Sequence, residues 1–542
     1  MYLVLLLYQL TQTARAADHR QITVPIMPKM LREEWRHGMK KWLLALLLPV
    51  IITGCSVNPV TGKNELSIVS PQQEVAIGEK NYRPSRQSQG GDYYLDKSLQ
   101  TYVTGVGQRL AAVSDRPDLP YEFVVLNNDV PNAWALPGGK IAINRGLLVL
   151  LEDEAQLAAV LGHEIVHAAA RHGASQMTRG TLANIGLVTL GVATQGSEGA
   201  QLYGMASQMG AAAWMAKYGR DDELESDYYG MNYMAKAGYE VQGAVELQEK
   251  FVELSKSRQS GFLDNLFASH PPSTQRVSEN QERAPSFAPG KRYRDRYQAA
   301  IAQLKKDAPA YQAETAAKKA LGKKQGKLAI QHLDKAVAHQ PEEGHFWELR
   351  GHAWKMLEEY SNAEKAYSTA IKKNDNFFSP YLARGVLLYE RGQRTKAKSD
   401  LRRSYQLLPT PTASYYLGEL SLQGKQYDQA NRYFKLAAQD AGALGNQSRQ
   451  RLQDLQLQMQ PQTFLTLNSA VSSNGYLLVK VANPSPRAMR QIIVEVSAAG
   501  AKKTIRLPTM LKANSAITIN TGIAYKAEVA YRATAVKAVL VE

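Results

Sequence analysis

Hydrophobic and polar residues follow three successive patterns along this chain. Up to about residue 300, apolar residues recur at helical spacing, most clearly in residues 152–173 and again from residue 219. From about residue 310 small residues recur at a fixed period, and beyond residue 460 apolar and polar residues alternate. The first two patterns predict helices and the third predicts strands. The sequence therefore indicates a multidomain α+β protein that is mainly helical.

The fixed period lies between residues 310 and 445. Ala317, Gly351, Gly385 and Gly418 follow one another at intervals of 34, 34 and 33 residues, and an alanine follows each of them by twelve. This is the tetratricopeptide period, and small residues at such positions permit close helix packing. We expect an α-solenoid of about four helix pairs. Its concave face would bind peptides or partner proteins; a spacer role is the alternative.

Alternating stretches occupy the C-terminal part of the chain, residues 462–542. Residues 476–486, 491–500 and 537–542 alternate apolar and polar positions, with turn residues between the stretches. This pattern predicts strands. We expect a small β-sandwich that binds a ligand or packs on the repeats.

The N-terminal part has the layout of a bacterial lipoprotein signal peptide in residues 39–54. Lys40 and Lys41 precede a short apolar run, which ends just before Cys55, the only cysteine of the chain. The run resembles a lipobox, so we expect the mature protein to begin at a lipidated Cys55 and to be anchored to a membrane. An uncleaved anchor helix is the alternative. Residues 1–38 fit neither a signal peptide nor an anchor helix and are interpreted as a gene-model extension.

The chain is basic, with a net charge of +16. Its Lys and Arg residues are spread along the sequence, and no nucleic-acid motif is present. For an exported chain we expect an anionic membrane surface, an acidic glycan or lipopolysaccharide as the partner of this charge, and no nucleic acid. Ser56 follows the lipidation site as in lipoproteins sorted to the outer membrane. We therefore predict a periplasmic protein anchored there.

Residues 163–167 read HEIVH, the pattern HExxH. In a helix, His163 and His167 project from one face and can hold one Zn²⁺. Glu164 then lies beside the open coordination position, where a carboxylate serves as the base in peptide-bond hydrolysis. The surrounding residues 152–173 predict the required helix, with Gly173 as its C-cap.

A third metal ligand is expected from residues 219–230, which read GRDDELESDYYG at the start of another predicted helix. Glu223, Glu225 and Asp227 are the candidates. From their spacing alone, none of the three is preferred, and an acidic, solvated helix start is the alternative.

The two motifs together resemble the zinc metallopeptidases that include HtpX-type membrane proteases, CAAX prenyl proteases and BepA-like periplasmic proteases, in which HExxH precedes a helix bearing ExxxD. This resemblance implies a mainly helical, zincin-type metallopeptidase domain over residues 55–300, of the gluzincin type, with one zinc per chain. It implies Glu223 as the third ligand, Asp227 as a catalytic-site carboxylate that orients a histidine, and Glu225 as a neighbour only.

Two further segments resemble the same family. Residues 132–148 look like the strand and turn before the active-site helix; an edge strand at Asn132, Ala133 and Trp134 would align an extended substrate, a plain hairpin being the alternative. The segment SHPPSTQRV contains His270, which the resemblance implies as a fourth ligand that closes the site until its loop moves. Residues 181–219 are predicted to form two helices over the cleft.

The combined interpretation is a lipid-anchored zinc endopeptidase of the bacterial envelope. Its repeats would recruit misfolded or unassembled envelope proteins and, by analogy with BepA-like proteases, contact outer-membrane assembly machinery. The main alternative is an assembly chaperone or scaffold whose metal site is latent or vestigial. An enzyme acting on peptidoglycan or another glycan is disfavoured, because no paired carboxylates with a sugar-binding aromatic cleft are found.

Overall fold

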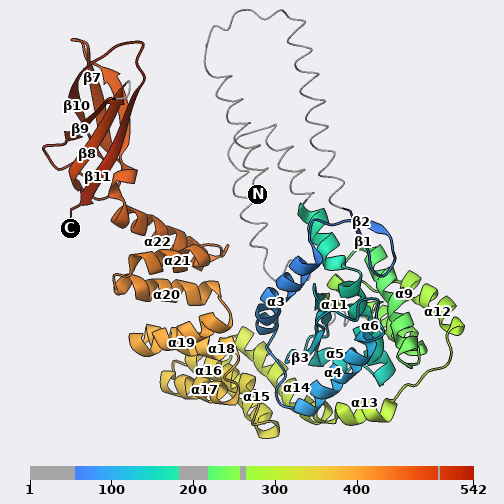
Figure 1. Ribbon diagram of the computed structural model, residues 1–542. Helices are drawn as coiled ribbons and strands as arrows, with labels where there is room; N and C mark the ends of the chain where they lie inside the picture. Colours follow the sequence, from blue (N-terminus) through green and yellow to red (C-terminus); the bar gives the residue numbers. More distant parts are fainter. Residues whose placement is uncertain (1–54, 182–217, 257–263, 499–500, 542) are drawn as a thin grey trace, which may run out of the picture.

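The computed structural model describes residues 55–181, 218–256, 264–498 and 501–541. The predicted extension and signal peptide lie outside these ranges, as do nearly all of the residues predicted to form helices over the cleft. Within the described residues, an N-terminal unit is followed by a stack of helices and then by two small sheets (Figure 1). No helix among the described residues is long and apolar enough to span a membrane.

A three-stranded sheet lies in the N-terminal unit, with the strand order β3-β5-β4. The strand β3 (Glu122–Leu126) runs parallel to β5 (Lys140–Asn144), and β4 (Ala133–Leu136) pairs antiparallel with β5. Gly138 and Gly139 form the turn between β4 and β5, both with positive φ. The predicted strand and turn at 132–148 are thus a hairpin whose first strand is a sheet edge.

Helices surround this sheet, and a short hairpin precedes them (Figure 1). The hairpin consists of β1 (Cys55–Val57) and β2 (Asn64–Leu66). The helices are α3 (Pro71–Ser88), α4 (Lys97–Ala111), α5 (Arg145–Leu148), α6 (Glu154–Ala169), α9 (Arg220–Lys236), α10 (Gln242–Lys256), α11 (Asp264–Ser269), α12 (Thr274–Arg283), the 3₁₀ turn η3 (Ala284–Ser286) and α13 (Arg294–Ala300).

The HExxH segment lies on α6, which is buried along almost its whole length. The side chain of Asp153 caps its N-terminus by accepting from the Gln156 backbone N–H at 3.0 Å. The prediction that this helix runs to a C-cap at Gly173 is wrong. It ends at Ala169, and Arg171 takes the left-handed conformation, with φ of 65°. The Arg171 side chain is anchored on the N-terminal segment, which holds the chain in this turn.

Two glycines bring α6 and α9 close together. A Cβ atom added at Gly162 on α6 would lie 3.2 Å from the Gly230 carbonyl oxygen, and one added at Gly230 would lie 3.2 Å from the His163 backbone nitrogen. The absence of side chains at both positions lets the two backbones approach. This contact sets the face of α6 that carries HExxH against the face of α9 that carries Glu223 and Asp227.

The helical repeats form four successive pairs followed by one more helix. They are α14 (Ala302–Gly322), α15 (Gly326–His339), α16 (Gly344–Met356), α17 (Tyr360–Lys373), α18 (Phe378–Glu390), α19 (Arg394–Leu407), α20 (Pro411–Gln423), α21 (Tyr427–Ala437) and α22 (Ala443–Met459). The small residues of the sequence repeat lie where paired helices touch. A Cβ atom at Gly351 would lie 2.3 Å from the Tyr367 ring, and one at Gly418 would lie 2.7 Å from the Phe434 ring.

The repeats pack directly on the N-terminal unit. The Tyr94 hydroxyl donates to the Glu342 carbonyl at 2.9 Å and accepts from the Gly344 N–H at 2.7 Å. Asn127, which follows β3, donates to Glu343 at 2.8 Å, and the Asn127 and Glu343 side chains are buried. These polar contacts hold the start of α16 against the sheet of the N-terminal unit.

The C-terminal part contains two three-stranded sheets, ordered β10-β7-β6 and β11-β8-β9. Buried residues of both sheets, such as Val479 and Val494, belong to one hydrophobic cluster. A 3₁₀ turn connects α22 to the first strand. The elements are η4 (Pro461–Phe464), β6 (Thr466–Val471), β7 (Tyr476–Asn483), β8 (Met489–Ala498), β9 (Ala501–Arg506), β10 (Ser515–Ala524) and β11 (Tyr531–Leu540).

Candidate metal centre

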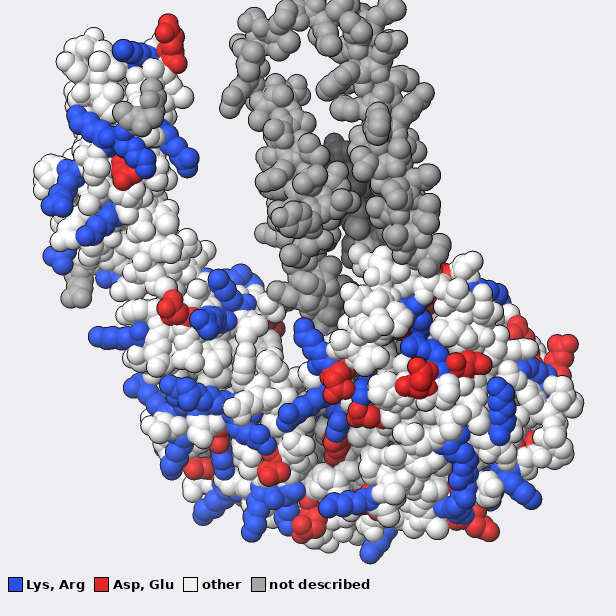
Figure 2. Space-filling model, viewed as in Figure 1, with Lys and Arg blue, Asp and Glu red and all other residues white. Residues whose placement is uncertain are grey.

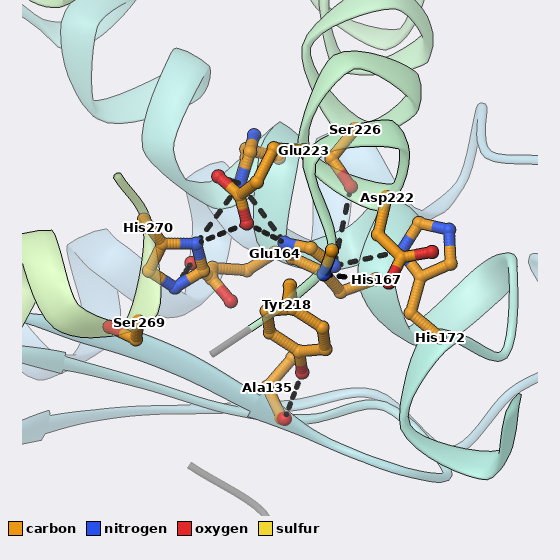
Figure 3. A network of polar contacts seen from close by, with 12 residues as sticks. Ala135, Glu164, His167, His172, Tyr218, Asp222, Glu223, Ser226, Ser269 and His270 are labelled. Carbon is orange, nitrogen blue, oxygen red and sulfur yellow. Dashed lines mark hydrogen bonds and ion pairs between the residues drawn. The ribbon is translucent and has the colours of Figure 1, made fainter. Parts of the chain in front are cut away.

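Four buried side chains from three segments converge beside α6. His163 and His167 come from α6, Glu223 comes from α9 and His270 follows α11, and one candidate ligand atom from each lies within 4.8 Å of all the others. The His163 and His167 Nε2 atoms are 3.0 Å apart, and His270 Nδ1 lies 3.3 Å from His163 Nε2 and 3.0 Å from Glu223 Oε1. Figure 3 shows His167, Glu223 and His270 pointing toward one another.

Three of the five distances between these atoms fit a tetrahedral metal ion, and the two of 3.0 Å are shorter than such an ion would set. Ligands at about 2.0–2.2 Å from a tetrahedral ion lie about 3.3–3.6 Å from one another. The Glu223 oxygens are 3.5 Å from His163 Nε2 and 3.4 Å from His167 Nε2, within that range. Three imidazole nitrogens and one carboxylate are a donor set that suits zinc.

Glu164 lies next to this cluster and is itself buried. Its Oε2 atom has no hydrogen-bond partner within the described residues, and its Oε1 atom lies 3.4 Å from His270 Nε2. Burial raises the pKa of Glu164 above its ordinary value. A carboxylate with a raised pKa and a free oxygen is suited to accept a proton and to return it.

Asp227 lies behind His163. Its Oδ1 atom is 2.9 Å from His163 Nδ1, so the other ring nitrogen, Nε2, faces the cluster. Arg276 on α12 makes two hydrogen bonds to Asp227, at 2.6 and 2.8 Å, and its NH1 atom lies 2.7 Å from Glu223 Oε2. Arg276 therefore places one positive charge between the Asp227 and Glu223 carboxylates.

His167 has a different set of neighbours. Its Nδ1 atom lies 2.8 Å from His172 Nδ1 and 3.3 Å from the Ser226 hydroxyl. Its ring stacks on Tyr218, with 3.7 Å between the ring centroids, and the Tyr218 hydroxyl donates to the Ala135 carbonyl of the edge strand at 3.4 Å. Tyr218 thus lies between β4 and the cluster (Figure 3).

The charges of the cluster oppose one another in a way that favours a bound cation. Burial opposes ionisation of Glu223, but the facing His270 and His163 hold its pKa well below the ordinary value. Burial also opposes the charged form of His163, but Glu223 and Asp227 raise its pKa to about 10. Burial lowers the pKa of His167 well below its ordinary value. The ionised Glu223 carboxylate and the neutral His167 imidazole attract a divalent cation, and His163 releases a proton when such an ion binds.

The sequence identified most of the groups that the fold brings together. His163, Glu164, His167, Glu223, Asp227 and His270 all lie at one site. Ala133 lies close by on β4, whereas Trp134 turns into a hydrophobic cluster and stacks edge-on with Tyr82. Cys55 begins the N-terminal hairpin.

Besides Tyr218 and Ser226, sequence reasoning missed the role of three groups at or behind the site. Arg276 lies within the segment quoted for His270 but carries no motif of its own. His172 was assigned to a helix end, and Glu225 was taken as a neighbour only, yet His172 Nε2 lies 3.3 Å from Glu225 Oε1. The available signal was weak: a histidine five residues after the second ligand, and a carboxylate two residues after the third.

A narrow, mainly apolar cavity of about 50 Å³ opens beside His163 and Glu164. Its walls come from β4, α9, α10 and the segment before His270. The apolar residues that line it include Ala133, Met231, Met234, Leu247, Phe251 and Leu266.

Comparison with known proteins relates this site to an established family. The model of peptidase family M48 matches residues 97–284. Metalloprotease YcaL of Escherichia coli K12 is 32% identical over 188 residues, which cover 33% of this chain and 70% of YcaL. The beta-barrel assembly-enhancing protease of the same strain is 27% identical over 267 residues, covering 46% of this chain and 54% of that protein.

The chain spans about half the length of the beta-barrel assembly-enhancing proteases that it matches. Among solved structures, MamA 41-end from Desulfovibrio magneticus RS-1 is similar over 28% of this chain and 84% of its own, with 18% identity and a TM-score of 0.25. The resemblance inferred from HExxH and ExxxD is confirmed by the family match and by the YcaL relationship. The chain belongs to peptidase family M48.

Proposed function

We propose that this protein is a zinc-dependent endopeptidase of the bacterial cell envelope. The observation that carries the proposal is the convergence of His163, His167 and Glu223 beside a buried carboxylate, Glu164, with a free oxygen. A zinc ion bound by these ligands would polarise a carbonyl group and lower the pKa of water.

The side chains of the site have separable tasks in peptide hydrolysis. Glu164 takes a proton from the attacking water and passes it to the leaving amine. Asp227 accepts from His163 Nδ1–H at 2.9 Å and so fixes the ring with Nε2 toward the ion. Arg276 keeps Asp227 ionised, because a guanidinium at 2.6 Å favours the charged carboxylate.

The edge strand β4 supports binding of an extended substrate. An unfolded segment would add to its edge at Asn132, Ala133 and Trp134 through backbone hydrogen bonds. Trp134 contributes only its backbone, since its side chain is buried. The adjacent apolar cavity would receive a substrate side chain next to the cleaved bond. Binding through the backbone favours unfolded or loop segments over a particular sequence.

His270 supports the proposal that the enzyme is latent in this conformation. Catalytic zinc needs one position for water or substrate, whereas His270 adds a fourth protein donor to the cluster. Its second ring nitrogen also faces Glu164, at 3.4 Å. Movement of the loop that carries His270 would open the ion and release the base together. The closed set of four donors equally favours the second candidate function, an assembly chaperone or scaffold that keeps its metal site shut.

The remaining parts of the chain would bring substrates to this site. The helical repeats, packed on the N-terminal unit through Tyr94, would recruit misfolded or unassembled envelope proteins or contact outer-membrane assembly machinery. We interpret the two C-terminal sheets as a β-sandwich with a binding role. Lys and Arg side chains are scattered over the repeats and these sheets and outnumber Asp and Glu there in Figure 2, which suits an anionic envelope surface. The lipid anchor at Cys55 would keep the protein at the outer membrane.

Incubation of the purified mature chain with casein tests this function. The wild type is compared with Glu164→Gln, with His270→Ala and with Glu152→Gln, which removes an exposed carboxylate just before α6. Zinc content is measured in every sample. We expect about one zinc per chain throughout, cleavage by wild type and Glu152→Gln, none by Glu164→Gln, and faster cleavage by His270→Ala.

The other outcomes separate the candidates. Cleavage by His270→Ala alone would show an enzyme that is fully latent. Bound zinc with no cleavage by any variant would favour the scaffold function. Absence of zinc from the wild type would refute the metal site itself.

A further inference from the structure

The two histidines of the HExxH helix are supported in different ways. His163 donates directly to a carboxylate, Asp227, at 2.9 Å. His167 Nδ1 instead meets another imidazole, His172, at 2.8 Å, and His172 Nε2 continues to Glu225 at 3.3 Å. Glu225 in turn accepts from the Asn58 side chain at 2.9 Å. A chain of polar groups thus runs from one metal ligand to the N-terminal hairpin.

We propose that His172, Glu225 and Asn58 form a positioning relay that orients His167 and strengthens zinc binding. The inference rests on the proposed zinc site, but it concerns residues that take no part in the reaction. It makes the hairpin that follows Cys55 part of the support of the metal centre. The segment next to the membrane anchor would then contribute to metal retention.

The directions of the hydrogen bonds agree along the whole relay. His167 faces the cluster with Nε2, 3.4 Å from Glu223 Oε1, so Nδ1 carries the hydrogen when Nε2 binds an ion. That hydrogen is donated to His172 Nδ1, which leaves the hydrogen of His172 on Nε2. His172 Nε2 then donates to Glu225 Oε1, and an ionised carboxylate accepts this hydrogen bond without being protonated. Each group therefore has one consistent role when the ion is bound.

Burial makes these bonds effective. His172 is 1% exposed and Asn58 is 2% exposed, so water cannot readily replace either partner. A buried imidazole that loses its acceptor leaves a donor unsatisfied, which is more costly than the loss of an exposed bond. The His167 ring would then lose its acceptor at Nδ1, where only the Ser226 hydroxyl and stacking on Tyr218 would remain to orient it from that side.

Asn58 is locked in the orientation that the relay requires. Its Oδ1 atom accepts from the backbone N–H groups of Val60 and Thr61, at 2.9 and 3.3 Å, within the turn of the hairpin. Its Nδ2 group is therefore directed outward, toward Glu225 at 2.9 Å and Glu65 at 2.8 Å. The turn of the hairpin thus presents a fixed donor to the relay.

Arg171 fastens the hairpin segment to the end of α6. It donates to the Ser56 hydroxyl, to the Val69 carbonyl at 2.5 Å and to Glu74 at 3.0 Å. Ser175 adds a bond to Glu65 of 2.7 Å. The left-handed turn at Arg171 places its side chain on the N-terminal segment and brings His172 next to His167. Adjacent residues therefore tie the same hairpin to the helix and to the metal ligand.

Zinc affinity is the direct test of the relay. The dissociation constant of the zinc ion is measured on the full mature chain by competition with a colorimetric chelator. His172→Leu removes the hydrogen bonds to His167 and to Glu225, and Glu225→Gln removes the negative charge of the acceptor. Asn58→Asp keeps the oxygen that accepts from the turn but replaces the donating amide group by a carboxylate oxygen that faces Glu225. Each should weaken zinc binding by about 10-fold or more, the usual effect of removing a group behind a metal ligand.

Controls separate positioning from general stability. Asp221→Asn removes a carboxylate from an exposed position on the same helix as Glu225 and should leave zinc affinity unchanged. His172→Gln retains one acceptor and one donor and should recover part of the affinity lost in His172→Leu. The melting temperature of each zinc-free protein is measured in parallel. A merely structural role would lower it without changing the zinc dissociation constant.

The inference is overturned if Glu225→Gln and His172→Leu bind zinc within twofold of the wild type while Asp227→Asn binds it at least 10-fold more weakly. If His172→Leu does not fold, Glu225→Gln and Asn58→Asp decide the question. A wild type that binds zinc but cleaves nothing would count against the proposed peptidase function alone, since the relay is judged by affinity. A wild type without zinc would overturn both.

Discussion

Replacement of Arg276 by methionine removes the positive charge that sits between two buried carboxylates. Arg276 is 4% exposed and makes hydrogen bonds of 2.6 and 2.8 Å to Asp227, and its NH1 atom lies 2.7 Å from Glu223. It also donates to the Pro271 carbonyl at 3.2 Å, next to His270. Methionine preserves the unbranched stem of the side chain but supplies no donor and no charge.

The structure sets the size of the expected effect. Removing one partner of a buried ion pair costs about 3–5 kcal/mol, because the remaining charge is left uncompensated. We therefore expect the zinc-free protein to lose about that much stability. Bound zinc supplies positive charge next to Glu223, so the zinc-bound variant should lose less. Peptidase activity should also fall, since Asp227 would no longer be held against His163.

Urea denaturation of the zinc-free and zinc-bound proteins measures both losses. Arg283→Met is the matched control: it lies on the same helix, is half-buried, and bonds to the neutral oxygens of Tyr228 and Asn232. Its loss should be about 1 kcal/mol. The reasoning fails if zinc-free Arg276→Met loses less than about 1 kcal/mol, or no more than the control, since a buried unpaired carboxylate would then cost nothing measurable.

Three further predictions follow from packing, charge and the metal. Gly230→Val should lower the melting temperature and weaken zinc binding, because even its first added atom meets the His163 backbone nitrogen at 3.2 Å; Gly105→Val, with nothing within 4 Å of its Cβ, is the control. Burial opposes the charge of His345, but Glu314 raises the pKa of His345 to about 9, so its stabilising effect, on the order of 1–3 kcal/mol, is complete below about pH 6.5 and lost as the pH rises through 9. Burial likewise opposes the charge of Glu314, but His345 lowers its pKa to about 2, so its own contribution persists above about pH 4.5. The melting temperature of the wild type should therefore fall between pH 6 and pH 9, whereas that of His345→Gln should not. An equal fall in both proteins would contradict this pairing. Chelation of the metal should lower the wild-type melting temperature, because zinc that binds only the folded state stabilises that state. An unchanged melting temperature would show that zinc does not bind the folded chain.

Local sequence was sufficient wherever one element carries the information. The HExxH pattern placed His163 and His167 on one helix face because the helical period depends only on spacing. The recurrence of Gly351, Gly385 and Gly418 predicted helix pairs, since close helix crossings exclude larger side chains at fixed intervals. The same local reasoning failed at Gly173, because contacts with the N-terminal segment end the helix earlier, at Ala169.

Spacing alone left Glu223, Glu225 and Asp227 as equal candidates for the third metal ligand. The family resemblance implied a different role for each, and the fold shows which group each one contacts. Residues i and i+4 of a helix share a face and residue i+2 points away from it, and only the packing of α9 on α6 decides which face meets the cluster. That packing sets Glu223 among the histidines, Asp227 behind His163 and Glu225 against His172.

The sequence by itself determined the chemistry that this protein can support, because the ligand types and their helical spacing are local properties. Only the tertiary structure decided which groups surround that chemistry. Arg276 and Asn58 reach the site from segments that are far from α9 in sequence, 49 and 167 residues from their carboxylate partners. Nothing in their local sequence marks them, since their roles arise from the packing of separate segments around one buried cluster of charge.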